Sequence, residues 1–224
     1  MITRPLVSKK GHLFVNLDGN LWLFDTGAPT SFGAHTNIVI ADQKFELTTE
    51  YFGLTHTRLS DYVGVPCVGL LGVDVLNQFD HILDTARNTL TLSATELPHN
   101  GRIVPLSDFM GIPILTVSIA HTHYPMFFDT GAQVSYFQDE SVRHFPPAGP
   151  INDFYPGFGS FQTETYQVDV ELAHTVFSIR CGILPDMLGA TLMMANTQGI
   201  IGNAILINRS IGFFPRRNIL SIIV

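Results

Sequence analysis

The amino-acid sequence predicts an all-β protein with two β-barrel-like lobes, related by a pseudo-twofold axis and carrying only short helices. Three observations point to this fold class. The tetrapeptide Asp-Thr-Gly-Ala occurs twice, about half the chain apart, with similar residues around each copy. Most apolar stretches are short or alternating and rich in β-branched and aromatic residues, as is typical of strands. Helical patterns are limited to a few short segments, so strands dominate.

The strands and helices follow from these patterns in chain order. The expected strands are 12–16, 20–24, 89–92, 114–119, 166–172, 175–179 and 218–224. The expected helices are 58–63 and 73–78 in the first half, and 139–144 and 204–208 in the second. The helix at 204–208 is expected because it mirrors the segment that begins at Val73.

The internal repeat divides the chain into an N-terminal lobe, residues 1–97, and a C-terminal lobe, residues 98–224. Each half contains one copy of Asp-Thr-Gly-Ala. The features that match outside the motif are Ser31-Phe32 with Ser135-Tyr136, and Leu70-Leu71-Gly72 with Ile200-Ile201-Gly202. The join is placed at 96–101, where polar and turn-forming residues cluster.

The composition excludes several partners and locations. Hydrophobic residues make up 46% of the chain and the net charge is −7, which argues against nucleic acid because phosphate binding needs clustered Lys and Arg. No apolar run reaches roughly 18 residues, so no membrane span is expected. The N-terminal residues lack the apolar core of a signal peptide, which favours a cytoplasmic location.

The two cysteines, Cys67 and Cys181, fall one in each half. The favoured interpretation is two reduced, buried thiols of an intracellular protein, and the alternative is one structural disulfide. The sequence has no His-Glu-x-x-His motif and no paired Cys-x-x-Cys, so neither a metal nor another cofactor is expected.

The doubled motif can bring two carboxylates together. Asp25 and Asp129 each follow a short apolar run, which would anchor them at the edge of a lobe. Two carboxylates that face each other share one proton, because ionising both is unfavourable. Such a pair can activate water for peptide hydrolysis without a metal. The alternative is that both tetrapeptides are ordinary β-turns of a repeat protein.

The neighbouring residues of each motif have expected supporting roles. The hydroxyl groups of Thr26 and Thr130 lie just behind the carboxylates, where they would brace the two lobes by hydrogen bonds. Gly27 and Gly131 can take backbone angles that other residues resist, and they let another chain, such as the substrate backbone, approach closely.

The two motifs with their flanking residues resemble the aspartic protease superfamily, which includes pepsins and retroviral proteases. The matching segments are Phe24-Asp25-Thr26-Gly27-Ala28 and Phe128-Asp129-Thr130-Gly131-Ala132, each followed by an apolar pair and glycine. Alanine after the glycine is similar to the retroviral type. The resemblance implies a bilobal acid-protease fold in which Asp25 and Asp129 form the catalytic dyad.

The resemblance also implies a flap, a β-hairpin that folds over the substrate. The interval that would hold it is longer in the second half, where residues 154–161 have the glycines and aromatic side chains of a hairpin tip. The expected substrate contacts there are Tyr155, Gly157, Phe158, Gly159 and Phe161. In the first half, residues 49–53 run directly into a helical pattern, so a single flap on the C-terminal lobe is expected. The alternative is an ordinary surface loop.

The expected function is an aspartic endopeptidase that hydrolyses extended polypeptides held by strand-like hydrogen bonds in the cleft. Because one chain carries both lobes, the resemblance implies an active monomer. The alternative function is a peptide-binding or regulatory module that has the same fold and does not cleave its ligand.

Overall fold

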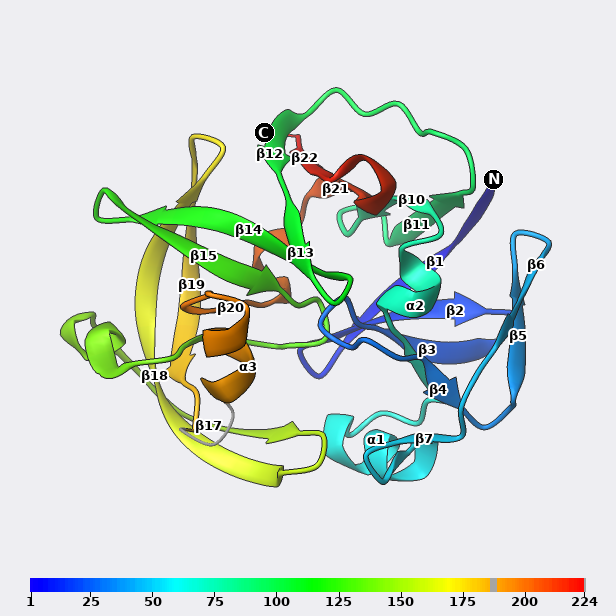
Figure 1. The fold of residues 1–224 in the computed structure, drawn as a ribbon, viewed down its shortest axis with the longest axis horizontal. Coiled ribbons are helices and arrows are strands. Elements are labelled where there is room, and N and C mark those ends of the chain that lie inside the picture. Colours follow the sequence, from blue (N-terminus) through cyan, green and yellow to red (C-terminus); the bar gives the residue numbers. More distant parts are fainter. Residues whose placement is uncertain (186–188, 224) are drawn as a thin grey trace.

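The protein is described by a computed structural model that covers residues 1–185 and 189–223 (Figure 1). Strands account for 53% of the chain and helices for 14%, so the prediction of an all-β protein with short helices is confirmed. The strands form two large sheets and two small hairpins.

The larger sheet has ten strands in the order β12-β22-β21-β10-β11-β1-β2-β3-β9-β4. Its strands are β1 (Ile2–Lys9), β2 (His12–Leu17), β3 (Asn20–Phe24), β4 (Phe32–Gly33), β9 (Gly69–Leu71), β10 (Asp80–Asp84), β11 (Thr89–Ser93), β12 (Arg102–Pro105), β21 (Ser210–Phe214) and β22 (Ile219–Ile222). Strand β1 joins the two parts of this sheet, because residues 2–5 pair with β11 and residues 6–9 pair with β2.

This sheet takes strands from both halves of the sequence. Strand β10 of the first half pairs antiparallel with β21 of the second half, and β12 and β22 extend the same sheet. The two halves are therefore connected by a continuous set of backbone hydrogen bonds. The division into lobes 1–97 and 98–224 stays a prediction.

The second sheet has eight strands in the order β13-β14-β15-β20-β16-β19-β18-β17, all from the second half. They are β13 (Ser107–Phe109), β14 (Ile112–Ile119), β15 (Thr122–Phe128), β16 (Ser135–Phe137), β17 (Pro147–Tyr155), β18 (Gly159–Leu172), β19 (Thr175–Ile183) and β20 (Gly199–Ile201). A further pairing between Ser118 and Glu171 links β14 to β18, so the sheet curls back on itself.

The remaining elements are short. The small hairpins are β5 (Asn37–Ile40) with β6 (Gln43–Glu46), and β7 (Glu50–Tyr51) with β8 (Leu54–Thr55). The α-helices are α1 (His56–Val63), α2 (Val73–Leu76) and α3 (Gly189–Met194), and the 3-10 helices are η1 (Glu140–His144), η3 (Asn203–Leu206) and η4 (Pro215–Arg217).

Several elements differ from the sequence prediction. The helices expected at 139–144 and 204–208 are observed as the 3-10 helices η1 (Glu140–His144) and η3 (Asn203–Leu206), and the helix expected at 73–78 ends at Leu76. The strand expected at 218–224 is observed as β22. It begins at Ile219 because Asn218 has a left-handed φ of 54° and ends η4. Val224 lies outside the described residues. The sequence analysis did not predict helix α3, because its six residues are almost all apolar or small and so show no alternation between an apolar and a polar face.

The same strand arrangement occurs once in each half. Strand β3 runs parallel to β9, which pairs antiparallel with β4. Strand β15 likewise runs parallel to β20, which pairs antiparallel with β16. Strands β3 and β15 end immediately before Asp25 and Asp129, so the fold presents the two motifs in equivalent positions.

A continuous apolar core lies behind these strands. It includes the fully buried side chains Phe24, Phe128 and Phe213, which come from both halves. Both cysteines are free and buried, as the favoured interpretation of the sequence expects. Within residues 1–185 and 189–223, no helix is long and apolar enough to cross a membrane.

Candidate active site

The two aspartates are fixed by the strands that precede them. The backbone N–H of Asp25 donates to the carbonyl of Leu71 at 3.0 Å, and that of Asp129 donates to Ile201 at 2.9 Å. Each bond continues the parallel pairing of the preceding strand by one residue. The apolar-apolar-Gly segments of the sequence are therefore the structural partners of the two Asp-Thr-Gly turns.

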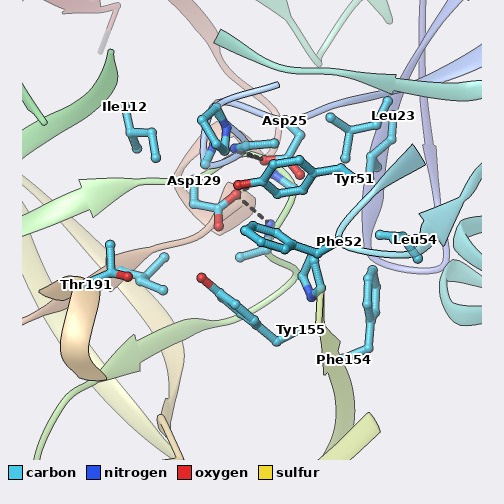
Figure 2. Close-up of a pocket in the computed structure, with 18 of the residues that line it drawn as sticks. Leu23, Asp25, Tyr51, Phe52, Leu54, Ile112, Asp129, Phe154, Tyr155 and Thr191 are labelled. Carbon is cyan, nitrogen blue, oxygen red and sulfur yellow. Dashed lines mark hydrogen bonds between the residues drawn. The ribbon is translucent and has the colours of Figure 1, made fainter. Parts of the chain in front are cut away.

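Backbone amides within each turn orient the carboxylates. One oxygen of Asp25, Oδ1, accepts hydrogen bonds from the N–H groups of Gly27 at 2.9 Å and Ala28 at 3.1 Å. Asp129 makes the equivalent bonds within its own turn at the same distances. Figure 2 shows the two carboxylates beside each other, with dashed lines that mark hydrogen bonds to them.

The threonines cross-link the two turns. Thr26 Oγ1 donates to the carbonyl of Phe128 at 2.6 Å and accepts the N–H of Thr130 at 3.0 Å. Thr130 Oγ1 reciprocates, donating to the carbonyl of Phe24 at 2.8 Å and accepting the N–H of Thr26 at 3.0 Å. Both side chains are fully buried. These four hydrogen bonds fix the two turns relative to each other, directly beneath the carboxylates.

The glycines allow the turns to approach each other. A Cβ atom built on Gly27 would lie 2.2 Å from Cγ of Asp129, and one on Gly131 would lie 2.4 Å from Cγ of Asp25. Neither glycine has a positive φ, so the turns do not use the backbone freedom of glycine. Both glycines are required because a side chain would occupy the space of the opposite carboxylate.

The environment of the pair raises both pKa values. Burial raises the pKa of Asp25 well above its ordinary value, and the negative charge of Asp129 beside it raises it further. Burial also raises the pKa of Asp129, whereas hydrogen bonds from Asp25 and from the backbone N–H groups of its own turn oppose that rise. The two side chains lie within hydrogen-bonding reach, so the pair can share one proton.

A pair of serines supports the turns from behind. Ser31 Oγ accepts the N–H of Gly72 at 2.8 Å, and Ser135 Oγ accepts that of Gly202 at 3.0 Å. Each serine lies six residues after the aspartate of its own turn, but the sequence did not predict that it supports the turn by a hydrogen bond. Ser31 is fixed further by Asp74, which accepts hydrogen bonds from its hydroxyl and its backbone N–H.

The second turn is supported by a different set of residues. Asn203 replaces Asp74 at the equivalent position, and its Nδ2 donates to the carbonyls of Gly11 at 2.8 Å and Thr130 at 3.3 Å. The buried ring of His12 lies beside this turn, with Nδ1 3.1 Å from the carbonyl oxygen of Gly131. The connection between β1 and β2 of the first half therefore braces the second turn.

The carboxylates lie half-buried in the floor of a cavity of about 340 Å³. Two separate apolar clusters supply its walls, one from each half. The first-half wall includes Leu23, Phe32, Leu54 and Leu70, and the second-half wall includes Phe109, Ile112, Phe161, Leu184 and Ile200. The aspartates are thus the floor between two apolar surfaces, which suits a ligand with bulky side chains.

The segment predicted to be a flap forms a long hairpin of β17 and β18. Gly157 and Gly159 have positive φ values of 78° and 96° and form its turn. Tyr155 and Phe161 line the cavity, whereas Phe158 at the tip is 40% exposed and packs edge-on against Phe161. Burial raises the pKa of Tyr155, and the nearby charges of Asp129 and Asp25 raise it further.

A second hairpin faces the first across the cavity, which the sequence analysis did not expect. Residues 49–53 do not run directly into a helix: β7 and β8 form a short hairpin before α1. Tyr51 and Phe52 from this hairpin line the cavity. Figure 2 shows the phenol of Tyr51 directed toward the two carboxylates, with Tyr155 entering from the opposite hairpin.

The long hairpin packs against the first half through an aromatic stack and through its turn. Phe154 of β17 stacks on Tyr62 of α1, with ring centroids 4.7 Å apart and planes 5° apart. Figure 1 shows the β17–β18 tip lying beside α1 and β7. A Cβ atom on Gly157 would lie 3.6 Å from Cβ of Phe52. The tip of the second-half hairpin therefore rests on the first half and covers the cavity.

Apart from the two aspartates of its floor, the described polar side chains that line the cavity are Asp153, Thr191 and the tyrosines Tyr51, Tyr136 and Tyr155. Among the described residues, no group of three His, Cys, Asp or Glu side chains is placed to hold a metal ion. The sequence matches no protein-family model and no curated protein.

Proposed function

We propose that this protein is an aspartic endopeptidase with a bilobal acid-protease fold. The observation that carries the proposal is the meeting of two Asp-Thr-Gly turns, one from each half, with their carboxylates within hydrogen-bonding reach in the floor of a cavity. The reciprocal threonine bonds and the space left by the two glycines support it, because they fix this geometry from both sides.

The proposed reaction uses one protonated and one ionised carboxylate, and we assign these roles to Asp25 and Asp129. Ionised Asp129 takes a proton from a water molecule between the carboxylates, and the water oxygen attacks the peptide carbonyl carbon. Protonated Asp25 donates its proton to the carbonyl oxygen, which gives a neutral tetrahedral diol. Asp129 then passes its proton to the leaving nitrogen, the C–N bond breaks, and Asp25 recovers a proton from one diol hydroxyl. The products are a carboxylic acid and an amine.

The substrate class follows from the shape of the site. The cavity lies beneath a two-stranded hairpin, whose backbone can pair with an extended polypeptide. The apolar walls on both sides of the dyad would hold the side chains that flank the scissile bond. Because both turns come from a single chain, the proposed active species is a monomer. The proposed chemistry needs no cofactor.

Peptide cleavage tests the proposal. We expect the protein to cleave members of a diverse peptide library and a statine-type inhibitor to block cleavage. Asp25→Asn and Asp129→Asn should each lower kcat/KM at least about a hundredfold, because each removes one half of the acid–base pair. Asp169→Asn, the same change on the exposed face of β18, is the matched control.

Retained cleavage in either dyad variant would overturn the proposal. If the wild-type protein binds peptides in the cavity and leaves them intact, the alternative of a peptide-binding module holds instead. Mass spectrometry of the products together with equilibrium binding separates these outcomes.

A further inference from the structure

The two walls of the cavity differ in charge. The first-half wall is apolar apart from the Tyr51 hydroxyl, whereas the second-half wall contains a carboxylate, Asp153. Among the described residues, the ionisable carboxylates that line the cavity are Asp25, Asp129 and Asp153. The first two form the floor, so Asp153 is an acidic group that the proposed reaction does not use.

Asp153 occupies a defined position on the hairpin. It lies on β17 opposite Phe161 of β18, so both side chains project from the same face of the hairpin, toward the cavity. Oδ2 accepts a hydrogen bond from the hydroxyl of buried Tyr136, and Oδ1 accepts one from the backbone N–H of Phe154 at 2.8 Å. Two fixed donors thus orient the carboxylate, and each oxygen retains a free acceptor position.

No cation of the described residues neutralises this carboxylate. The ion pairs within residues 1–185 and 189–223 do not involve Asp153, which is bonded to Tyr136 and paired with Phe161 and shares the cavity wall with the apolar Leu184. It lies close enough to Asp129 for its charge to act on that group. A substrate that fills the cavity would remove water from Asp153, which is costly for an unpaired charge.

We infer that Asp153 makes the second-half wall a subsite for a Lys or Arg side chain next to the scissile bond, with an apolar residue on the other side. This inference rests on the function proposed above and adds its substrate preference. The aliphatic stem of the basic side chain packs along Phe161 and Leu184, and its charged end meets Asp153. The net charge of −7 also favours the approach of basic substrates.

Four matched peptides test the inference. They differ only in the two residues that flank the scissile bond, each of which is Lys or norleucine, a Lys analogue without the ammonium group. We expect the wild-type protein to have a higher kcat/KM for one of the two peptides with a single Lys than for the peptide with two norleucines. Asp153→Asn should lower that preference about tenfold or more, because it removes the charge and keeps the shape.

A second variant separates charge from positioning. Tyr136→Phe removes one hydrogen bond to Asp153 and keeps the carboxylate, so the ratio of Lys to norleucine cleavage should still favour Lys. A wild-type protein without any Lys preference would contradict the inference. So would an Asp153→Asn variant that loses activity equally toward all four peptides, since that pattern describes a structural role of Asp153.

Binding measurements keep the inference independent of catalysis. The same four peptides, made with a reduced and therefore uncleavable central bond, are titrated calorimetrically against the wild-type protein and Asp153→Asn. Tighter binding of one single-Lys peptide, lost in the variant, supports the subsite even if no peptide is cleaved. Cleavage without any Lys preference in binding or in kcat/KM leaves the proposed function intact and overturns the subsite.

Discussion

Glycine in each Asp-Thr-Gly-Ala turn leaves space for a carboxylate that comes from the opposite half of the chain. A single methyl group on Gly27 would lie within 2.6 Å of three atoms of the Asp129 carboxyl group. The sequence shows a glycine after each Asp-Thr pair, but the structural reason for this glycine is a contact between residues that lie far apart in the chain. The structural reason is thus close approach and not backbone conformation.

The change Gly27→Ala tests this reason. The new methyl group must push the Asp129 carboxylate away, so we expect kcat/KM to fall by about a hundredfold or more and stability to fall by about 1–3 kcal/mol. Urea denaturation measures the free energy of unfolding, and peptide hydrolysis measures the activity.

The control for this change is Gly189→Ala, which adds the same group at the start of α3. The nearest atom there is Nε2 of the flexible Gln138 side chain at 3.4 Å, so that variant should fold and cleave as the wild type does. If Gly27→Ala retained full activity, the tight contact between the two turns would not exist in solution.

At the scale of elements, the site is completed by two hairpins of unequal length. The long β17–β18 hairpin was predicted from its glycines and aromatic residues, because tight turns leave a local signal. The short β7–β8 hairpin was not, because strands of two residues have no measurable alternation. Its two aromatic residues, Tyr51 and Phe52, reach the cavity only through tertiary packing.

The stack of Tyr62 on Phe154 holds the long hairpin against α1. We expect Tyr62→Ala to weaken this docking by about 0.5–1.5 kcal/mol, the usual strength of an aromatic pair, and to raise KM about two- to tenfold with less effect on kcat. Backbone amides at the tip of β17 and β18 should exchange hydrogen faster.

Tyr62→Phe keeps the ring and is the matched control. Because hydrogen exchange reports the docking without any substrate, the prediction can be checked even in the absence of activity. Unchanged exchange at the hairpin tip in Tyr62→Ala would show that the stack does not hold the hairpin.

At the scale of the whole molecule, two buried polar groups lie where the halves join. Asp80 is fully buried and forms ion pairs with Arg216 and Arg217, which lie in η4 at the other end of the sequence. His81, the next residue, is buried among Phe24, Phe79 and Phe213, and its Nε2–H donates to the carbonyl of Leu76 at 2.7 Å. Burial lowers the pKa of His81 to about 4.

This histidine should make stability depend on pH. The unfolded chain protonates His81 near pH 6.5 and the folded chain only near pH 4, so its stabilising contribution is complete above pH 6.5 and is lost as the pH falls toward 4. The shift predicts a loss of about 2 kcal/mol between pH 7 and pH 5. Urea denaturation at the two pH values measures it.

His81→Gln keeps an N–H donor and does not titrate, so it should remove most of this pH dependence. Burial also lowers the pKa of His99, which contributes in the same direction and remains in the variant. An equal loss of stability in the wild type and His81→Gln would assign the pH dependence to other groups. His81 therefore makes the protein less stable in mild acid than near neutral pH, whereas the raised pKa values of Asp25 and Asp129 act in the opposite direction, so the difference between the wild type and His81→Gln is the decisive measurement.

The sequence by itself determined the strand-rich class, the duplication, and the two Asp-Thr-Gly-Ala turns with the apolar strands before them, because these depend on neighbouring residues and on a repeated pattern. Only the tertiary structure decided that Tyr51, Asp153 and His12 lie around the same site. Their positions depend on pairings such as β10 with β21 and β17 with β18, and long-range contacts of this kind leave no periodic signal along the chain.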